Sequence, residues 1–170
     1  MDILTFAVLM LLPALAIVAG LHDLTTMKIP NWISGLIVLG FVPAALLTGL
    51  SLPAAGLHLA VGAVALLVGM ALFALRIIGG GDAKLLAAAT LWMGPAGAPV
   101  FLVWTALVGG LFCLGLILAR RYFPLVAPAA PGWVASLMAP KGDIPYGVAI
   151  AAGVLLAYPA SPLMTAFAGG

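Results

Sequence analysis

The chain has 170 residues, of which 66% are hydrophobic and 6% charged, with a mean hydropathy of +1.35 and no glutamate. A soluble domain carries about 25% charged residues, so this composition excludes a water-soluble protein and is typical of a membrane protein. The net charge of +2 rests on few groups, and the lack of a basic, aromatic-rich patch argues against nucleic acid as a partner. Because Cys113 is the one cysteine and no His/Cys cluster has metal-ligand spacing, we expect no disulfide, no metal and no organic cofactor.

Six apolar segments follow one another along the chain, which predicts an all-α, polytopic membrane protein with six transmembrane helices in one domain, residues 1–170. We expect the first segment to be retained, since no Lys or Arg precedes it as in a signal peptide. Residues 83–118 are too long for one crossing at about 1.5 Å per residue, and several Gly and Pro residues interrupt them, so they predict a tight helical pair. The expected helices are residues 3–21, 32–50, 54–75, 83–97, 100–118 and 144–167.

The basic residues support this count. With six crossings, all six fall on one membrane face: Lys28, Arg76, Lys84, Arg120, Arg121 and Lys141. Since cytoplasmic loops carry the excess of Lys and Arg, that face is predicted to be cytoplasmic, with both termini outside. Lys28 and Lys84 are interpreted chiefly as anchors of helix ends at the lipid headgroups.

Two of the four acids need an explanation. Asp23 ends the first predicted helix and Asp82 begins the fourth, so the topology places both at the cytoplasmic side at a similar depth. Ionisable residues in a helix bundle are costly and are usually functional. Two neighbouring carboxyl groups cannot both ionise easily, and such a pair can act as acid and base on a water molecule, as in an aspartic protease. A structural interpretation stays open, in which Asp23 pairs with Lys28 and Asp82 caps its helix near Lys84.

Three consecutive glycines precede Asp82. They permit backbone conformations closed to other residues and a close approach of a second chain, as a protease needs when it holds a peptide extended. They could equally form a flexible connector or a helix-packing surface.

With these residues, the chain resembles the type IV prepilin peptidases, which are intramembrane aspartic proteases with a G-x-G-D motif. Gly79-Gly80-Gly81-Asp82 matches that motif, Asp23 precedes Ile29-Pro30-Asn31 as the family's first aspartate precedes the same triplet, and Ile144-Pro145-Tyr146-Gly147 is similar to its Pro-aromatic-Gly element. The resemblance implies Asp23 and Asp82 as catalytic residues. It implies substrate-binding or supporting roles for Pro30, Asn31, Gly79, Gly80, Gly81, Lys84, Pro145, Tyr146 and Gly147.

The same resemblance implies an endopeptidase that removes the basic, glycine-terminated leader of a prepilin or pseudopilin at the cytoplasmic face of the inner membrane, without cofactor. Larger family members carry a cytosolic insert with paired cysteines and also methylate the new N-terminus. That insert is missing here, so the chain resembles the short form associated with tight-adherence pili, and we expect no methyltransferase activity.

Two other functions remain open from the residues. A small proton-coupled transporter would use Asp23 and Asp82 as relay sites, but it predicts inverted repeats that the sequence does not show. In a non-catalytic assembly factor the aspartates would be dispensable. His22 could orient Asp23, although a helix-end histidine facing headgroups is the commoner case, and His58, expected on the outer side, receives no role.

Overall fold

The computed structural model describes residues 2–122, 131–140 and 142–169. Within these ranges it contains helices, turns and no strand, and it confirms the predicted class, an all-α polytopic membrane protein. Among the described residues, four helical stretches are long and apolar enough to cross a membrane, namely Ile3–Thr26, Leu52–Ala74, Gly80–Tyr122 and Gly147–Gly169, while Asn31–Leu47 is a shorter apolar helix. The number of six crossings stays a prediction.

The first hydrophobic stretch forms α1 (Ile3–Leu9) and α2 (Leu11–Thr26). The prediction ended this helix at residue 21, but it continues for one more turn, so Asp23 lies inside the helix rather than at its end. The helix stops at Met27, which adopts a left-handed conformation (φ 55°) and donates its N–H to the Asp23 carbonyl oxygen at 2.8 Å. After Pro30, whose fixed φ and missing N–H suit a helix start, α3 (Asn31–Leu47) begins.

The predicted helical pair is α5 (Gly80–Tyr122), which follows α4 (Leu52–Ala74) and is broken at Gly94. Gly94 has φ 60° and ψ −175°, a conformation essentially limited to glycine. The prediction placed the break at residues 97–100, which was wrong, because the helix resumes directly after Gly94 and runs through Pro99. We call residues 80–93 the first arm and residues 95–122 the second arm.

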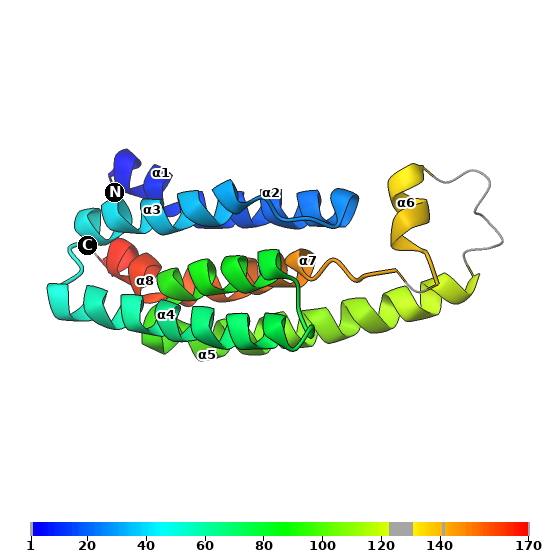
Figure 1. Cartoon of the computed structure of the whole chain (residues 1–170). Helices are drawn as coiled ribbons and strands as arrows, with labels where there is room; N and C mark the ends of the chain where they lie inside the picture. The colour runs from blue at the N-terminus through cyan, green and yellow to red at the C-terminus, as the bar shows by residue number, and fades with distance from the viewer. Residues whose placement is uncertain (1, 123–130, 141, 170) are drawn as a thin grey trace.

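The two arms of α5 run in opposite directions. Along the first arm, Ala83 meets Gly69 of α4 and Leu91 meets Gly62, so these helices are antiparallel. Along the second arm, Gly97 lies near Pro162 and Thr105 meets Gly153, so this arm runs antiparallel to the C-terminal helices. Figure 1 shows the second arm returning past α4 and extending beyond the start of the first arm.

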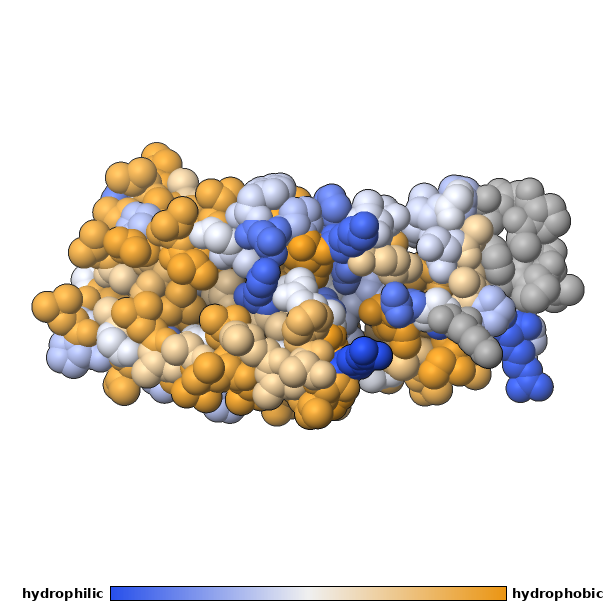
Figure 2. All heavy atoms as spheres, in the orientation of Figure 1, coloured by the Kyte–Doolittle hydropathy of each residue, from blue (hydrophilic) through white to orange (hydrophobic). Residues whose placement is uncertain are grey.

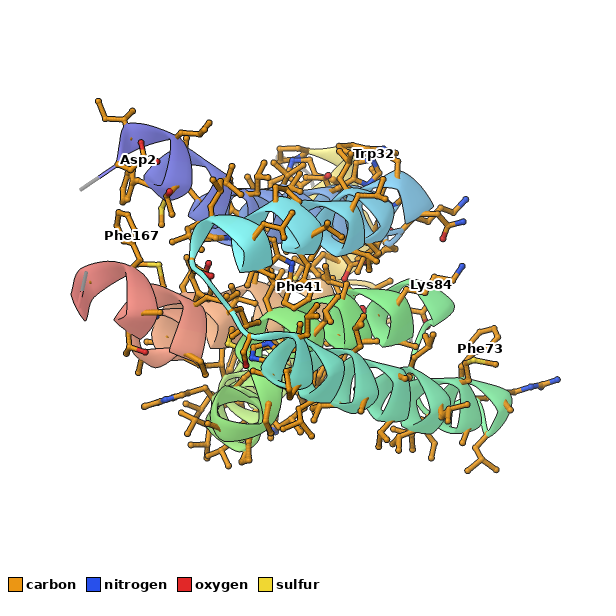
Figure 3. The ribbon with its side chains drawn as sticks, turned by 90° about the vertical axis from the view of Figure 1, so that its left-hand side faces the viewer. Asp2, Trp32, Phe41, Phe73, Lys84 and Phe167 are labelled. Carbon is orange, nitrogen blue, oxygen red and sulfur yellow. The ribbon has the colours of Figure 1, made fainter. Side chains whose placement is uncertain are left out.

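His58 explains how the break in α5 is tolerated. Pro95 has no N–H, so the Leu91 carbonyl oxygen lacks the donor that a regular helix would supply. The buried His58 of α4 supplies it, with Nδ1 2.8 Å from that oxygen, and its ring stacks on Phe41 of α3, which points into the interior in Figure 3. No partner for His58 was predicted from the sequence, because the Leu91 carbonyl group is left without a donor by a proline 37 residues after His58.

The C-terminal part is more broken than predicted. It consists of α6 (Gly132–Leu137), α7 (Gly147–Ala157), the 3₁₀ helix η3 (Tyr158–Ala160) and α8 (Pro162–Gly169). The expected helix over residues 144–167 thus starts three residues later and is interrupted by Pro159 and Pro162, which cannot donate backbone hydrogen bonds. The short α6 lies in a predicted loop, of which residues 123–130 and the basic residue Lys141 lie outside the described residues.

The helices form a bundle with a polar and an apolar end. Its core includes Trp92, fully buried, whose Nε1 donates to the Ile37 carbonyl oxygen at 2.8 Å and so ties α5 to α3. Both termini lie at one end, while α2 ends and α5 begins toward the other (Figure 1). On the face shown in Figure 2, apolar residues cover the end with the termini and hydrophilic residues gather over the far ends of α2 and α4 and toward α6.

Candidate active site

Asp23 connects α2 to the start of α7. Its side chain is only 5% exposed, and Oδ2 accepts a hydrogen bond of 2.8 Å from the backbone N–H of Gly147. The first N–H groups of a helix have no partner within that helix, so Asp23 satisfies one of them across 124 positions of sequence. This contact fixes the Asp23 carboxyl group against a rigid backbone element.

Asp82 occupies the third position of α5 and uses one of its two oxygens locally. Oδ2 accepts from the Gly79 N–H at 3.2 Å, which is the return bond of a capping box, so the structural role considered for this residue is real. Oδ1 is different, because it is buried and has no hydrogen-bond partner within the described residues. Buried polar atoms are nearly always paired, and this one is therefore available to a water molecule or substrate.

Both carboxyl groups face one cavity of about 690 Å³, which we call the aspartate cavity. A smaller cavity of about 300 Å³ also touches both, between the α2–α3 turn and the glycines. As predicted, Asp23 and Asp82 come from distant parts of the sequence and lie at the same cavity. The aspartate cavity is lined by Asp23, Met27, Arg76, Ile77, Ile78, Gly79, Asp82, Cys113, Gly142, Asp143, Ile144, Pro145 and Tyr146.

Glycines permit the close packing around this cavity. A Cβ atom on Gly147 would lie 2.9 Å from Asp23 Oδ2 and 2.9 Å from Ile29 Cδ1, and one on Gly81 would lie 2.9 Å from Ile29 Cβ. Ile29 is thereby wedged between the start of α5 and the start of α7. Gly79 is equally restricted by Asp82, whereas Gly80 faces only the ring of Phe73, which Figure 3 shows on α4.

The motif residues of α3 lie to one side of the cavity. Pro30 is the N-cap of α3, and Lys84 Nζ donates to Asn31 Oδ1 at 2.9 Å, with Lys84 reaching from α5 toward α3 in Figure 3. Neither Asn31 nor Lys84 lines the aspartate cavity. Their contact joins α3, which follows Asp23, to α5, which carries Asp82.

Pro145 and Tyr146 form part of the cavity wall. A Cβ on Gly109 would lie 2.6 Å from Tyr146 Oη, so only glycine at that position of α5 admits the ring. Burial raises the pKa of the Tyr146 phenol, and the phenol therefore stays protonated at neutral pH and can donate a hydrogen bond.

His22 is tied to the α2–α3 turn. Its Nδ1 lies 2.7 Å from the carbonyl oxygen of Lys28, and because a carbonyl only accepts, this nitrogen carries the proton. Thr26 Oγ1 lies 2.8 Å from the same nitrogen. The imidazole thus stabilises the turn between Asp23 and Pro30, and it does not line the aspartate cavity.

Sequence reasoning missed four residues around the cavity. Arg76, Cys113 and Asp143 line it, and Arg120 hydrogen-bonds to the carbonyl oxygen of Asp143. The motif Pro145-Tyr146-Gly147 could have indicated Asp143, two positions before it. The other three had no such signal, because their places depend on how the second arm of α5 and the α4–α5 turn pack.

The fold and the site define a class, namely polytopic membrane proteins with two carboxyl groups from separate helices facing one internal cavity. Within that class the chain belongs to the Type IV leader peptidase family, whose pattern matches residues 10–114. This range contains both aspartates, the Ile29-Pro30-Asn31 triplet and the three glycines, so the resemblance inferred from the motifs is confirmed at the level of the family.

Two curated relatives carry the name prepilin leader peptidase/N-methyltransferase, from Aeromonas salmonicida and from its strain A449. Each is 41% identical to this chain over 68 residues, which cover 35% of this chain and 23% of the relative. The match thus spans about a quarter of the length of these relatives. No solved structure matches the chain.

Proposed function

We propose that the protein is an aspartic endopeptidase that removes the leader peptide of a prepilin or pseudopilin, with Asp23 and Asp82 as the catalytic pair. The observation that carries the proposal is the convergence of these two carboxyl groups, 59 positions apart, on one cavity in a chain of the leader peptidase family. Asp23 is buried and Asp82 is half-buried in a membrane protein, where ionisable groups are usually functional.

In the proposed mechanism the ionised carboxyl group takes a proton from water, and the water oxygen attacks the scissile carbonyl carbon. The protonated carboxyl group donates to the carbonyl oxygen, and collapse of the tetrahedral intermediate breaks the C–N bond while a proton passes to the leaving amine. The different surroundings of the two carboxyl groups support different roles for them. The Gly147 N–H holds Asp23 in place, whereas Asp82 Oδ1 has no protein partner within the described residues. The buried Tyr146 phenol in the cavity wall is a further donor for the substrate backbone.

The substrate would reach the aspartates from the cytoplasmic face of the inner membrane, with its residues near the cut unwound and extended. Gly79, Gly80 and Gly81 lie beside both aspartates in the smaller cavity, and their backbone can approach a peptide strand closely. We assign no methyltransferase activity, and we place the chain with the short peptidases of tight-adherence pili.

The decisive experiment incubates the purified protein in detergent with a purified prepilin and compares wild type, Asp23→Asn and Asp82→Asn. We expect both variants to lose cleavage by at least about a thousandfold, since removal of a group that acts in the chemical step has effects of this order. Asp143→Asn is the matched control, because Asp143 lines the same cavity but is exposed, and it should keep most of the activity.

Cleavage by either folded asparagine variant at the wild-type rate would disprove the catalytic pair. If wild type leaves the prepilin intact but moves protons across the membrane of vesicles in an Asp23- and Asp82-dependent manner, the chain is a transporter. Loss of pilus assembly without either activity would point to an assembly factor instead.

A further inference from the structure

The Arg120 side chain donates three hydrogen bonds to backbone carbonyl groups, which a residue that only anchors a helix end at the lipid headgroups does not need. It lies near the end of the second arm of α5 and is half-buried. Nε and Nη2 donate to the carbonyl oxygen of Leu137 at 3.0 and 2.8 Å, and Nη2 also donates to the carbonyl oxygen of Asp143 at 2.9 Å. Its neighbour Arg121 is exposed and makes no side-chain hydrogen bond within the described part of the chain.

These acceptors belong to two separate segments. Leu137 is the last residue of α6, where helix carbonyl groups lack partners, and Asp143 lies in the stretch of residues 142–146 that lines the aspartate cavity. A guanidinium presents several N–H groups in a rigid plane, so it can fix two acceptors in one geometry. Arg120 therefore joins α6 and the cavity wall to the second arm of α5.

The segment that Arg120 holds continues directly to Gly147, which binds Asp23. Four residues after the acceptor, the Gly147 N–H donates to Asp23. The backbone between Asp143 and Gly147 has little conformational freedom, because Pro145 has a fixed φ and the Tyr146 side chain packs against Gly109. A shift of the backbone at Asp143 is thus carried to Gly147 and to the carboxyl group that Gly147 holds.

We propose that Arg120 is a positioning residue of the active site, which orients residues 143–147 and through them the carboxyl group of Asp23. This inference rests on the proposed function for its effect on cleavage, whereas its effect on the shape of the cavity does not depend on it. A residue that only anchored the helix at the headgroups would be replaceable by lysine, and Arg121 would serve as well.

The test compares Arg120→Gln and Arg120→Lys with Arg121→Gln and Arg121→Lys, each as the full chain in detergent. For prepilin cleavage we expect both Arg120 variants to lose kcat by about tenfold or more, with a smaller change in KM, because a misplacement of 1 Å costs up to about a hundredfold. Lysine cannot reproduce the planar fork, so it should rescue only partly. The Arg121 variants should match wild type.

Cys113 gives a second measurement that needs no activity. It lines the aspartate cavity and is partly accessible, so its rate of alkylation by a small water-soluble maleimide reports on the cavity wall. We expect this rate to change at least about threefold in the Arg120 variants, the size expected when a local opening equilibrium shifts by under 1 kcal/mol, and to stay constant in the Arg121 variants.

An unchanged kcat per folded molecule together with an unchanged Cys113 rate in Arg120→Lys and Arg120→Gln would overturn the inference, as would equal effects in the Arg121 variants. An increase in KM alone would show that Arg120 contacts the substrate and does not position Asp23. A wild-type protein without cleavage contradicts the proposed function only, since the Cys113 rates still decide the role of Arg120.

Discussion

Single atoms of Gly147 determine how Asp23 is held. Its N–H is the hydrogen-bond donor to Oδ2 of Asp23, and its missing side chain leaves the space that this oxygen and Ile29 occupy. Any residue except proline would supply this N–H, so glycine is required here for the space alone, although α7 is a regular helix at this point.

Gly147→Ala should reduce cleavage by about tenfold or more, because the added methyl group would lie 2.9 Å from Asp23 Oδ2 and must displace it. The measurement is the rate of prepilin cleavage per folded molecule. Gly110→Ala is the control, since a Cβ there meets nothing within 4 Å. Equal rates for the two variants would show that the Gly147–Asp23 contact has no part in the reaction.

At the same scale, the sequence predicted the two aspartates and the residues of the three motifs, because each lies in a local pattern of recognisable spacing. It could not predict Arg120 or His58. The partner of each is a backbone carbonyl group far along the chain, exposed by a helix end at Leu137 or by Pro95, and no local pattern records that distance.

Among the elements, α5 has the most unusual construction, because two antiparallel arms meet at a single glycine in a non-helical conformation. The composition of residues 83–118 was enough to predict a helical pair, since Gly and Pro gather there. The position of the break was not predictable, because Gly94-Pro95, Gly97 and Pro99 are all typical of a turn, and the contact of His58 with the Leu91 carbonyl group exists only in the folded chain. His58 contributes by pairing with the carbonyl group freed at the break.

His58→Phe should lower the free energy of unfolding by about 1–3 kcal/mol, since it leaves the buried Leu91 carbonyl group without a donor. Chemical denaturation in detergent measures this. His58→Gln retains an N–H donor and should lose less, and Leu57→Ala, whose side chain is 57% exposed, is the control for changes on α4. Cleavage per folded molecule should not change, and a larger loss in His58→Gln than in His58→Phe would contradict the role of the hydrogen bond.

For the whole molecule, the important feature is the separation of its ends. Both termini lie at one end, and the end of α2 and the start of α5 lie away from them (Figure 1); these two helix ends carry Asp23 and Asp82. The count of six apolar segments, together with the gathering of all basic residues on one side, predicted that both termini lie on the side opposite to the aspartates. The breaks inside the first and last helices, at Met10 and near Pro159, were not predicted, since apolar residues continue through them.

The predicted orientation can be tested with Ser51→Cys and Ser136→Cys in a Cys113→Ala background, using a membrane-impermeant thiol reagent on intact cells. Both serines are exposed, and Ser51 caps the start of α4. We expect labelling at position 51 from outside, and at position 136 only after the membrane is opened. Labelling of both positions in intact cells would refute the count of six crossings.

The length of the first arm of α5 has a consequence for the surrounding lipid. Its 14 residues, 80–93, rise about 21 Å, some 9 Å less than the hydrocarbon thickness of about 30 Å. Either the bilayer thins around this arm or Asp82 sits below the level of the headgroups. Thinning would bring the membrane surface to Asp82, whereas a low position of Asp82 would require the substrate's peptide bond to enter the bilayer, so under the proposed function we expect the rate of cleavage to depend on membrane thickness.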